Sequence, residues 1–172
     1  DDDAINCETL TFDANRLEPQ IALPDEVDKV VSVTEAAGEV IDQAYLGSCT
    51  NGRFEDLQEA ARILKRRQVA AGVRMLVSPA SQSIYQRALR EGVIETLADA
   101  GAIILAPSCG ACLGLHSGIL AKGEKAISST NRNFVGRMGH KESQIFLGSP
   151  ASVAAAAVEG RIADPRKYLQ EG

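Results

Sequence analysis

The side chains with the clearest chemical potential in this sequence are its four cysteines and two closely spaced arginines, Arg132 and Arg137. Cys109 and Cys112 form a C-x-x-C pair, which places two thiols close enough for one metal centre or for a disulfide. That spacing alone fits a redox pair, half of a zinc site or the ligands of an iron–sulfur cluster. Gly110, which lies inside the pair, allows backbone amides to approach the sulfur atoms closely. The pair therefore predicts metal or redox chemistry and leaves its kind open.

Cys49 is a third candidate ligand, at a predicted strand-to-helix junction. The N-terminus of a helix has free N–H groups and a partial positive charge, which favour a thiolate and an anionic cluster. The alternative is a buried structural cysteine. Cys7 lies in the least regular part of the sequence, and we interpret it as a small core residue rather than a fourth ligand. An iron–sulfur cluster with three cysteine ligands would leave one iron open, as Lewis-acid catalysis requires.

The segment 128–137 contains Arg132 and Arg137 among small and amide residues, which is typical of a loop that binds carboxylates. The planar guanidinium group matches a carboxylate with two parallel hydrogen bonds. The alternative is a pair of solvated surface arginines. The two histidines, His116 and His140, match no catalytic pattern, and we assign no catalytic residue on this chain.

The elements that must position these residues alternate between strands and helices. This alternation predicts an α/β fold, a three-layer αβα domain with a mainly parallel sheet. In such folds sites form beyond the carboxyl ends of the strands, which selects the loops 47–53, 107–114 and 129–139. The run 102–106 is short and fully apolar, which suggests a strand buried on both faces. We expect strands at 40–46, 73–77, 102–106, 125–129 and 144–147, and helices at 53–69, 81–90, 93–100 and 150–159.

The first part of the chain is less regular. We expect residues 1–38 to form an arm that packs on a single α/β domain made of residues 39–172. Residues 8–13 alternate like a half-buried strand, with Leu10 and Phe12 on one face, and residues 27–33 suggest a short extended segment. The sequence starts at Asp1 without an initiator methionine, so we interpret it as a piece of a longer protein.

The overall composition excludes several classes of protein. Hydrophobic residues make up 45% and charged residues 24% of the chain, as is usual for a globular domain. No apolar run reaches the length of about 18 residues that a transmembrane helix needs. The net charge of −5 argues against nucleic acid as the main partner. The first residues lack the features of a secretory signal, which favours a cytoplasmic location.

Three stretches of this sequence resemble the signature stretches of the aconitase superfamily: 47–53 (GSCTNGR), 107–112 (PSCGAC) and 131–137 (NRNFVGR). Their order and spacing also agree, and the resemblance covers nearly the whole chain. Within the superfamily the chain most resembles the large subunits of 3-isopropylmalate dehydratase, homoaconitase and 2,3-dimethylmalate dehydratase. It corresponds to the later, cluster-binding part of that subunit.

The resemblance implies a site and a reaction. It implies a 4Fe-4S cluster, easily lost on purification, on Cys49, Cys109 and Cys112. It also implies substrate binding by Arg132 and Arg137, with Asn131, Ser48 and Asn51 around the cluster. The implied hydro-lyase isomerises a 2-hydroxy di- or tricarboxylic acid by dehydration and rehydration. The expected substrate is isopropylmalate, in leucine biosynthesis, with the acids used by homoaconitase, aconitase or dimethylmalate dehydratase as alternatives.

The resemblance also implies partners. These are the remaining N-terminal domains of the large subunit and a small subunit, in a heterodimer or heterotetramer. In the family the small subunit or swivelling domain carries the serine base, so we expect this chain alone to be inactive. An alternative from another class is a structural or interaction module with zinc at the same cysteines. Regulatory RNA binding, known in the superfamily, fits poorly with the acidic charge.

Overall fold

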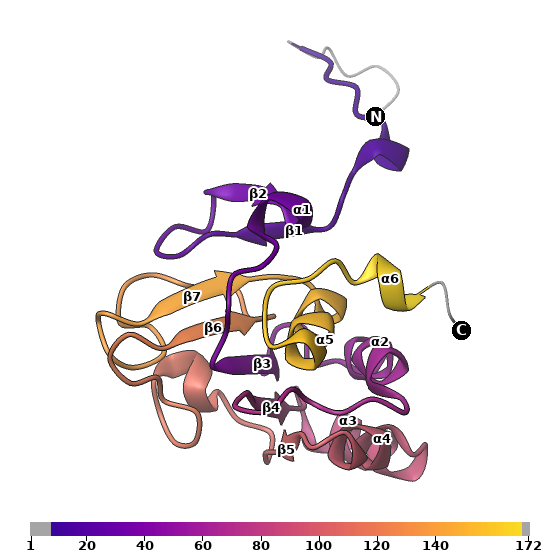
Figure 1. Cartoon of the computed structure of the whole chain (residues 1–172). Coiled ribbons are helices and arrows are strands. Elements are labelled where there is room, and N and C mark those ends of the chain that lie inside the picture. Colours follow the sequence, from indigo (N-terminus) through magenta and orange to yellow (C-terminus); the bar gives the residue numbers. More distant parts are fainter. Residues whose placement is uncertain (1–7, 170–172) are drawn as a thin grey trace.

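A computed structural model of the chain describes residues 8–169. Within that range seven strands form one sheet in the order β2-β1-β7-β6-β3-β4-β5 (Figure 1). The five strands from β7 to β5 run parallel, whereas β1 is antiparallel to both of its neighbours. The α/β class and the mainly parallel sheet that we expected are therefore confirmed. The strands are β1 (Gln20–Ala22), β2 (Val30–Ser32), β3 (Gln43–Gly47), β4 (Arg74–Ser78), β5 (Ile103–Ile104), β6 (Lys125–Ser128) and β7 (Gln144–Leu147).

Two of the helices begin where their residue types predict. Ser81 accepts the N–H of Ile84 and caps α3, and Ser149 caps α5, which has Pro150 in its first turn. None of the helices within residues 8–169 is long and apolar enough to cross a lipid bilayer. The α-helices are α1 (Val33–Ala36), α2 (Phe54–Leu64), α3 (Gln82–Arg90), α4 (Val93–Asp99), α5 (Pro150–Glu159) and α6 (Arg166–Leu169), and the 3-10 helices are η1 (Ala14–Arg16) and η2 (Gly110–Leu113).

Alternating side chains of the strands build two cores, one on each face of the sheet. On β3, Ala44 and Leu46 lie in the larger core, which α2, α4 and α5 cover (Figure 1). Tyr45, between them, points to the opposite face and packs with Ala111 and Cys112 in a smaller core. That second face is covered by η2 and by irregular chain instead of α-helices. The middle strands thus position the C-x-x-C segment by burying its Ala111 and Cys112 against this face.

Three details differ from the sequence-based expectations. Residues 8–13 do not form a strand, and Leu10 and Phe12 are exposed, because no described strand lies beside them to pair with their backbone. The 102–106 strand is short and half-exposed at Ile103, because β5 is an edge strand of the sheet. Helix α2 stops at Leu64 instead of 69, and Arg66 adopts a left-handed backbone conformation.

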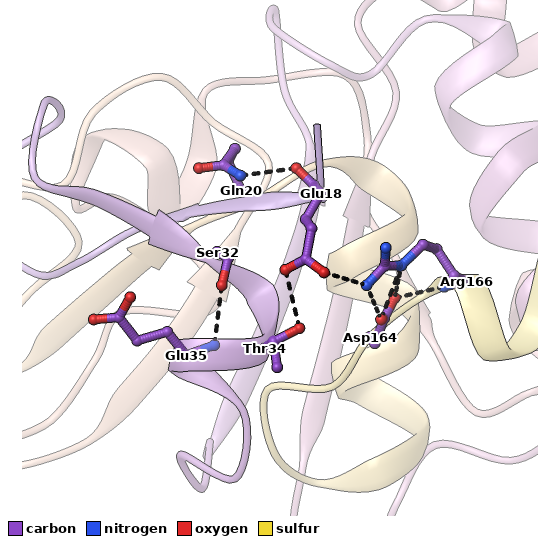
Figure 2. Close-up of polar contacts among 7 residues, drawn as sticks. All are labelled: Glu18, Gln20, Ser32, Thr34, Glu35, Asp164 and Arg166. Carbon is purple, nitrogen blue, oxygen red and sulfur yellow. Dashed lines mark hydrogen bonds and ion pairs between the residues drawn. The ribbon is translucent and has the colours of Figure 1, made fainter. Parts of the chain in front are cut away.

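The N-terminal part of the described chain is joined to its C-terminal part by a cluster of charged and polar groups (Figure 2). Arg166 donates to Glu18 at 3.1 Å and to Asp164 at 2.6 Å. The Thr34 hydroxyl donates to the second oxygen of Glu18 at 3.1 Å. These hydrogen bonds, above all those from Arg166, hold the pKa values of Glu18 and Asp164 below their usual range. The residues that flank the strand pair β1–β2 are thus connected to the start of α6.

This cluster predicts that acid loosens the N-terminal segment. A carboxyl group whose pKa is lowered by folding stabilises the fold at any pH above its ordinary pKa of about 4. This stabilisation is lost as the pH falls through the pKa that the group has in the folded protein. The Val33 N–H, which donates to the Pro19 carbonyl at 2.8 Å, should therefore lose protection from hydrogen exchange in acid, relative to its intrinsic exchange rate. Arg166→Gln should lower the protection of the Val33 N–H already at neutral pH. In this variant, acid should cause little further loss of protection. Arg161→Gln, a change at another exposed arginine, is the control, and an equal effect of both variants would contradict the prediction.

Candidate functional site

Hydrogen bonds join the three loops selected from the sequence at the carboxyl ends of the parallel strands. We name them the first loop (47–53), the second loop (107–114) and the third loop (129–139). The Gly47 N–H at the start of the first loop donates to the Ser129 hydroxyl at 2.8 Å. The Asn51 amide donates to the Ser129 carbonyl at 2.6 Å. The first and third loops are thereby held side by side.

Ser78, at the end of β4, connects the first loop to the second. Its carbonyl accepts the Ser48 N–H at 2.8 Å, and its hydroxyl donates to the Ser108 carbonyl at 3.0 Å. Ser78 is fully buried. Sequence reasoning missed this residue, because a serine at the end of a strand carries no signal of its partners.

Two glycines show how tightly the loops approach. A β-carbon on Gly47 would lie 2.2 Å from the Ser78 carbonyl oxygen, and its φ of 98° also disfavours other residues. A β-carbon on Gly114 would lie 3.2 Å from the Arg137 carbonyl oxygen. The second and third loops are therefore also in contact.

The cysteines differ in exposure. Cys49 and Cys109 are exposed and Cys112 is buried, and all three are free thiols. Within residues 8–169 no three His, Cys, Asp or Glu side chains are close enough together to hold a single metal ion. In a four-iron cluster each cysteine binds a different iron, so its ligands stand farther apart than those of one ion. The three-cysteine ligand set stays a prediction, and Cys7 lies outside the described residues.

The backbone of the first loop is strained around Cys49. Ser48 has a φ of 77° and Asn51 a φ of 53°, conformations that non-glycine residues rarely adopt. The Ser48 hydroxyl is buried and has no hydrogen-bond partner in the protein. A buried hydroxyl without a partner costs free energy, so this group suits a site that an anionic sulfur-containing group completes. The donor set and this hydroxyl fit an iron–sulfur cluster.

The third loop presents its arginines in different environments. Asn131 and Arg132 are exposed and line a cavity of about 510 Å³, together with Asp25, Glu26 and Asp28 of the β1–β2 loop. The Arg137 guanidinium lies 5.3 Å from the ring centre of Phe134. The Nε of Arg137 is buried and has no hydrogen-bond partner in the protein, so this group is available to donate to a bound carboxylate.

Asn133 holds the third loop in place, a role that the sequence reasoning missed. Its side chain is 1% exposed, and its amide donates to the Leu23 carbonyl at 2.7 Å and the Glu26 carbonyl at 3.3 Å. The loop that carries Arg132 is thereby attached to the β1–β2 loop. The only signal for this role was the position of Asn133 between site residues.

Tyr45 lies below the second loop and was likewise missed. Its hydroxyl donates to the Cys109 carbonyl at 3.2 Å. Burial raises the pKa of the Tyr45 phenol to about 12, so the hydroxyl keeps its proton at physiological pH and remains a donor. The histidines have local surroundings: His116 is exposed, and the His140 ring accepts the Glu142 N–H at 3.0 Å.

The chain is similar to known proteins over nearly its whole length. Residues 33–160 match the aconitase family (aconitate hydratase). Over 160 residues the chain is 54% identical to 3-isopropylmalate dehydratase large subunit 1 of Methanopyrus kandleri. This alignment covers 93% of this chain and 38% of that protein. The chain is 56% identical over 165 residues to the 3-isopropylmalate dehydratase large subunit of a Sulfurihydrogenibium species, covering 96% of this chain and 38% of that protein.

A further relative has a different name. The chain is 51% identical over 172 residues to the probable methanogen homoaconitase large subunit of Methanothermobacter thermautotrophicus, covering 100% of this chain and 40% of that protein. The chain thus spans about two fifths of the length of these curated relatives. Because residues 33–160 match the family and contain all three loops, the chain belongs to the aconitase family.

Proposed function

We propose that this chain is the cluster-binding part of a hydro-lyase large subunit, which isomerises a 2-hydroxy acid by dehydration and rehydration. The observation that carries the proposal is the hydrogen-bonded assembly of the three loops in an aconitase-family domain. That assembly brings the segments with the candidate cluster ligands next to the segment with the candidate carboxylate-binding arginines.

Each group on this chain has a separate role in the proposal. Cys49, Cys109 and Cys112 would hold a 4Fe-4S cluster, with the buried Ser48 hydroxyl beside it. When bound, the cluster supplies an open iron that acts as a Lewis acid on the hydroxyl group that leaves. Arg137 binds a substrate carboxylate through its forked guanidinium group, which orients the acid and keeps it in place.

Arg132 and Asn131 complete the proposed substrate site. Arg132 supplies a second guanidinium group for a dicarboxylic acid, and Asn131 a neutral amide close to it. Asn133 keeps this part of the third loop in place by its hydrogen bonds to the β1–β2 loop. Proton transfer from the substrate carbon needs a base, and we assign that base to a small-subunit partner.

The names of the relatives guide the choice of substrate. The two dehydratase relatives favour isopropylmalate, and the homoaconitase relative supports a tricarboxylic acid as the alternative. Their description as large subunits supports a small-subunit partner. A cytoplasmic location suits the proposal, because a cluster needs reduced cysteine thiols and the cytosol keeps thiols reduced.

The experiment compares the native assembly with the isolated 172-residue chain, both reconstituted with iron and sulfide without oxygen. We expect the assembly to form an unsaturated acid from isopropylmalate, homocitrate or dimethylmalate, detected by its ultraviolet absorbance. The chain alone should bind iron without turnover, because it lacks the base and a closed site that excludes water.

Three outcomes would contradict this proposal in different ways. An assembly that is active on none of these acids would contradict the hydro-lyase function. Comparable turnover by the chain alone would contradict the assignment of the base to a partner. A colourless protein with stoichiometric zinc would favour the alternative of a structural zinc module at the same cysteines.

A further inference from the structure

Tyr45 bonds to two loops of the candidate site and lies just before the remaining loop in the chain. It lies in β3, two residues before Gly47, where the first loop begins. Its backbone carbonyl accepts the Ser129 N–H at 3.0 Å, at the start of the third loop. Its hydroxyl donates to the Cys109 carbonyl in the second loop at 3.2 Å. Tyr45 therefore joins the second and third loops by hydrogen bonds, as Ser78 joins the first and second.

The acceptor of the Tyr45 hydroxyl also belongs to the turn that joins the two cysteines. The Cys109 carbonyl accepts the Cys112 N–H at 3.0 Å, which closes the C-x-x-C turn. A carbonyl oxygen has two lone pairs and can accept both donors. The Tyr45 hydroxyl therefore binds the Cys109 carbonyl oxygen, the same atom whose hydrogen bond to the Cys112 N–H holds the two cysteines in one turn.

The surroundings of the hydroxyl indicate a specific role. Tyr45 is completely buried, and burying a hydroxyl costs free energy unless the hydroxyl has a hydrogen-bond partner. If the side chain served only to fill this space, Phe would therefore be the better residue. A β-carbon on Gly110 would lie 3.1 Å from the hydroxyl oxygen, so the second loop rests directly on it. Cys112 packs in the same small core as Tyr45.

We propose that Tyr45 is a positioning residue that holds Cys109 and Cys112 in a ligating arrangement before any cluster is bound. This inference rests on the proposed function, since it concerns the same site. Because Tyr45 is completely buried under the second loop, the role proposed for it is positioning and not catalysis. It acts through the backbone of the second loop, so that less conformational freedom is lost when the cysteines bind iron.

The test removes the hydroxyl and retains the ring. In the native protein stripped of metal with a chelator, the rate of alkylation by iodoacetamide is mapped at each cysteine by mass spectrometry. Tyr45→Phe should speed alkylation of the buried Cys112 by about threefold to tenfold, the effect of losing one hydrogen bond. Alkylation of Cys49, on another loop, should stay unchanged. In reconstituted protein, iron should pass to a chelator faster by a similar factor.

Two further variants separate positioning from general loosening. Tyr85→Phe removes a hydroxyl from α3 and should leave both rates unchanged. Gly110→Ala places a methyl group against the Tyr45 hydroxyl and also strains the left-handed backbone of Gly110 (φ 46°), so it should speed alkylation of Cys112 for both reasons. In the Tyr45→Phe background only the backbone strain remains, so the same change should speed alkylation by a smaller factor. Tyr45→Phe keeps the ring that packs in the small core, so this variant should fold.

Equal rates at Cys112 in Tyr45→Phe and Tyr85→Phe would overturn the proposal. So would equal acceleration at Cys49 and Cys112, which would show loosening of the whole domain. Additive effects of Tyr45→Phe and Gly110→Ala would exclude the contact between them. If the unaltered protein binds no cluster, the proposed function fails, whereas the alkylation rates still decide whether Tyr45 positions the second loop.

Discussion

Changing Cys112 to serine in the native assembly is expected to abolish cluster binding and, with it, all turnover. Iron–sulfur clusters are held by cysteine thiolates, and serine replaces the soft sulfur ligand by a hydroxyl. Loss of an outer partner of a metal ligand already costs about 10–100-fold in affinity, so loss of a ligand itself should cost more. Cys49→Ser and Cys109→Ser should have the same effect. Iron and sulfide per chain, together with visible absorbance, measure the result after anaerobic reconstitution.

Cys7→Ser is the matched control, because it makes the same chemical change at the one cysteine that we exclude from the ligand set. It should retain the iron content and activity of the unaltered protein. The ligand assignment fails if Cys7→Ser loses the cluster or if any of the other three variants keeps it. The thermal midpoint of each variant shows whether a loss of iron reflects unfolding instead.

Arg137→Lys is expected to lower kcat/KM by about 100-fold and to leave the iron content unchanged. Lysine keeps the positive charge and loses the planar fork that binds a carboxylate with two hydrogen bonds. Hydrogen bonds to charged groups contribute about 1.5–3 kcal/mol each, which supports an effect of this size. The buried Nε of Arg137, which has no partner in the protein, is the group whose loss should matter most.

The control for this change is Arg90→Lys, at an exposed arginine in the last turn of α3. It should leave kcat/KM unaltered. Activity of Arg137→Lys within twofold of the unaltered enzyme would assign Arg137 to the structure of the third loop. Loss of iron in Arg137→Lys would instead connect this residue to cluster binding, against the role proposed for it.

Much of the fold follows from local sequence patterns. The bounds of β7 and α5 agree with the expected 144–147 and 150–159, since a short apolar run and a Ser-Pro start followed by alanines leave little choice. The family resemblance rests on residues close together in sequence, such as Cys109 and Cys112. Local chemistry also placed the three loops at the carboxyl ends of parallel strands.

By itself, the sequence determined the α/β class, the order of the elements and the candidate ligands, because hydrophobic period, caps and motifs act over a few residues. Only the tertiary structure decided that β5 is an edge strand and that β1 and β2 extend the sheet. It also decided the roles of Ser78, Asn133 and Tyr45, each of which has a hydrogen-bond partner 30 or more positions away along the chain. Such partners meet only after the strands have paired and the two cores have closed, so no local pattern reveals them.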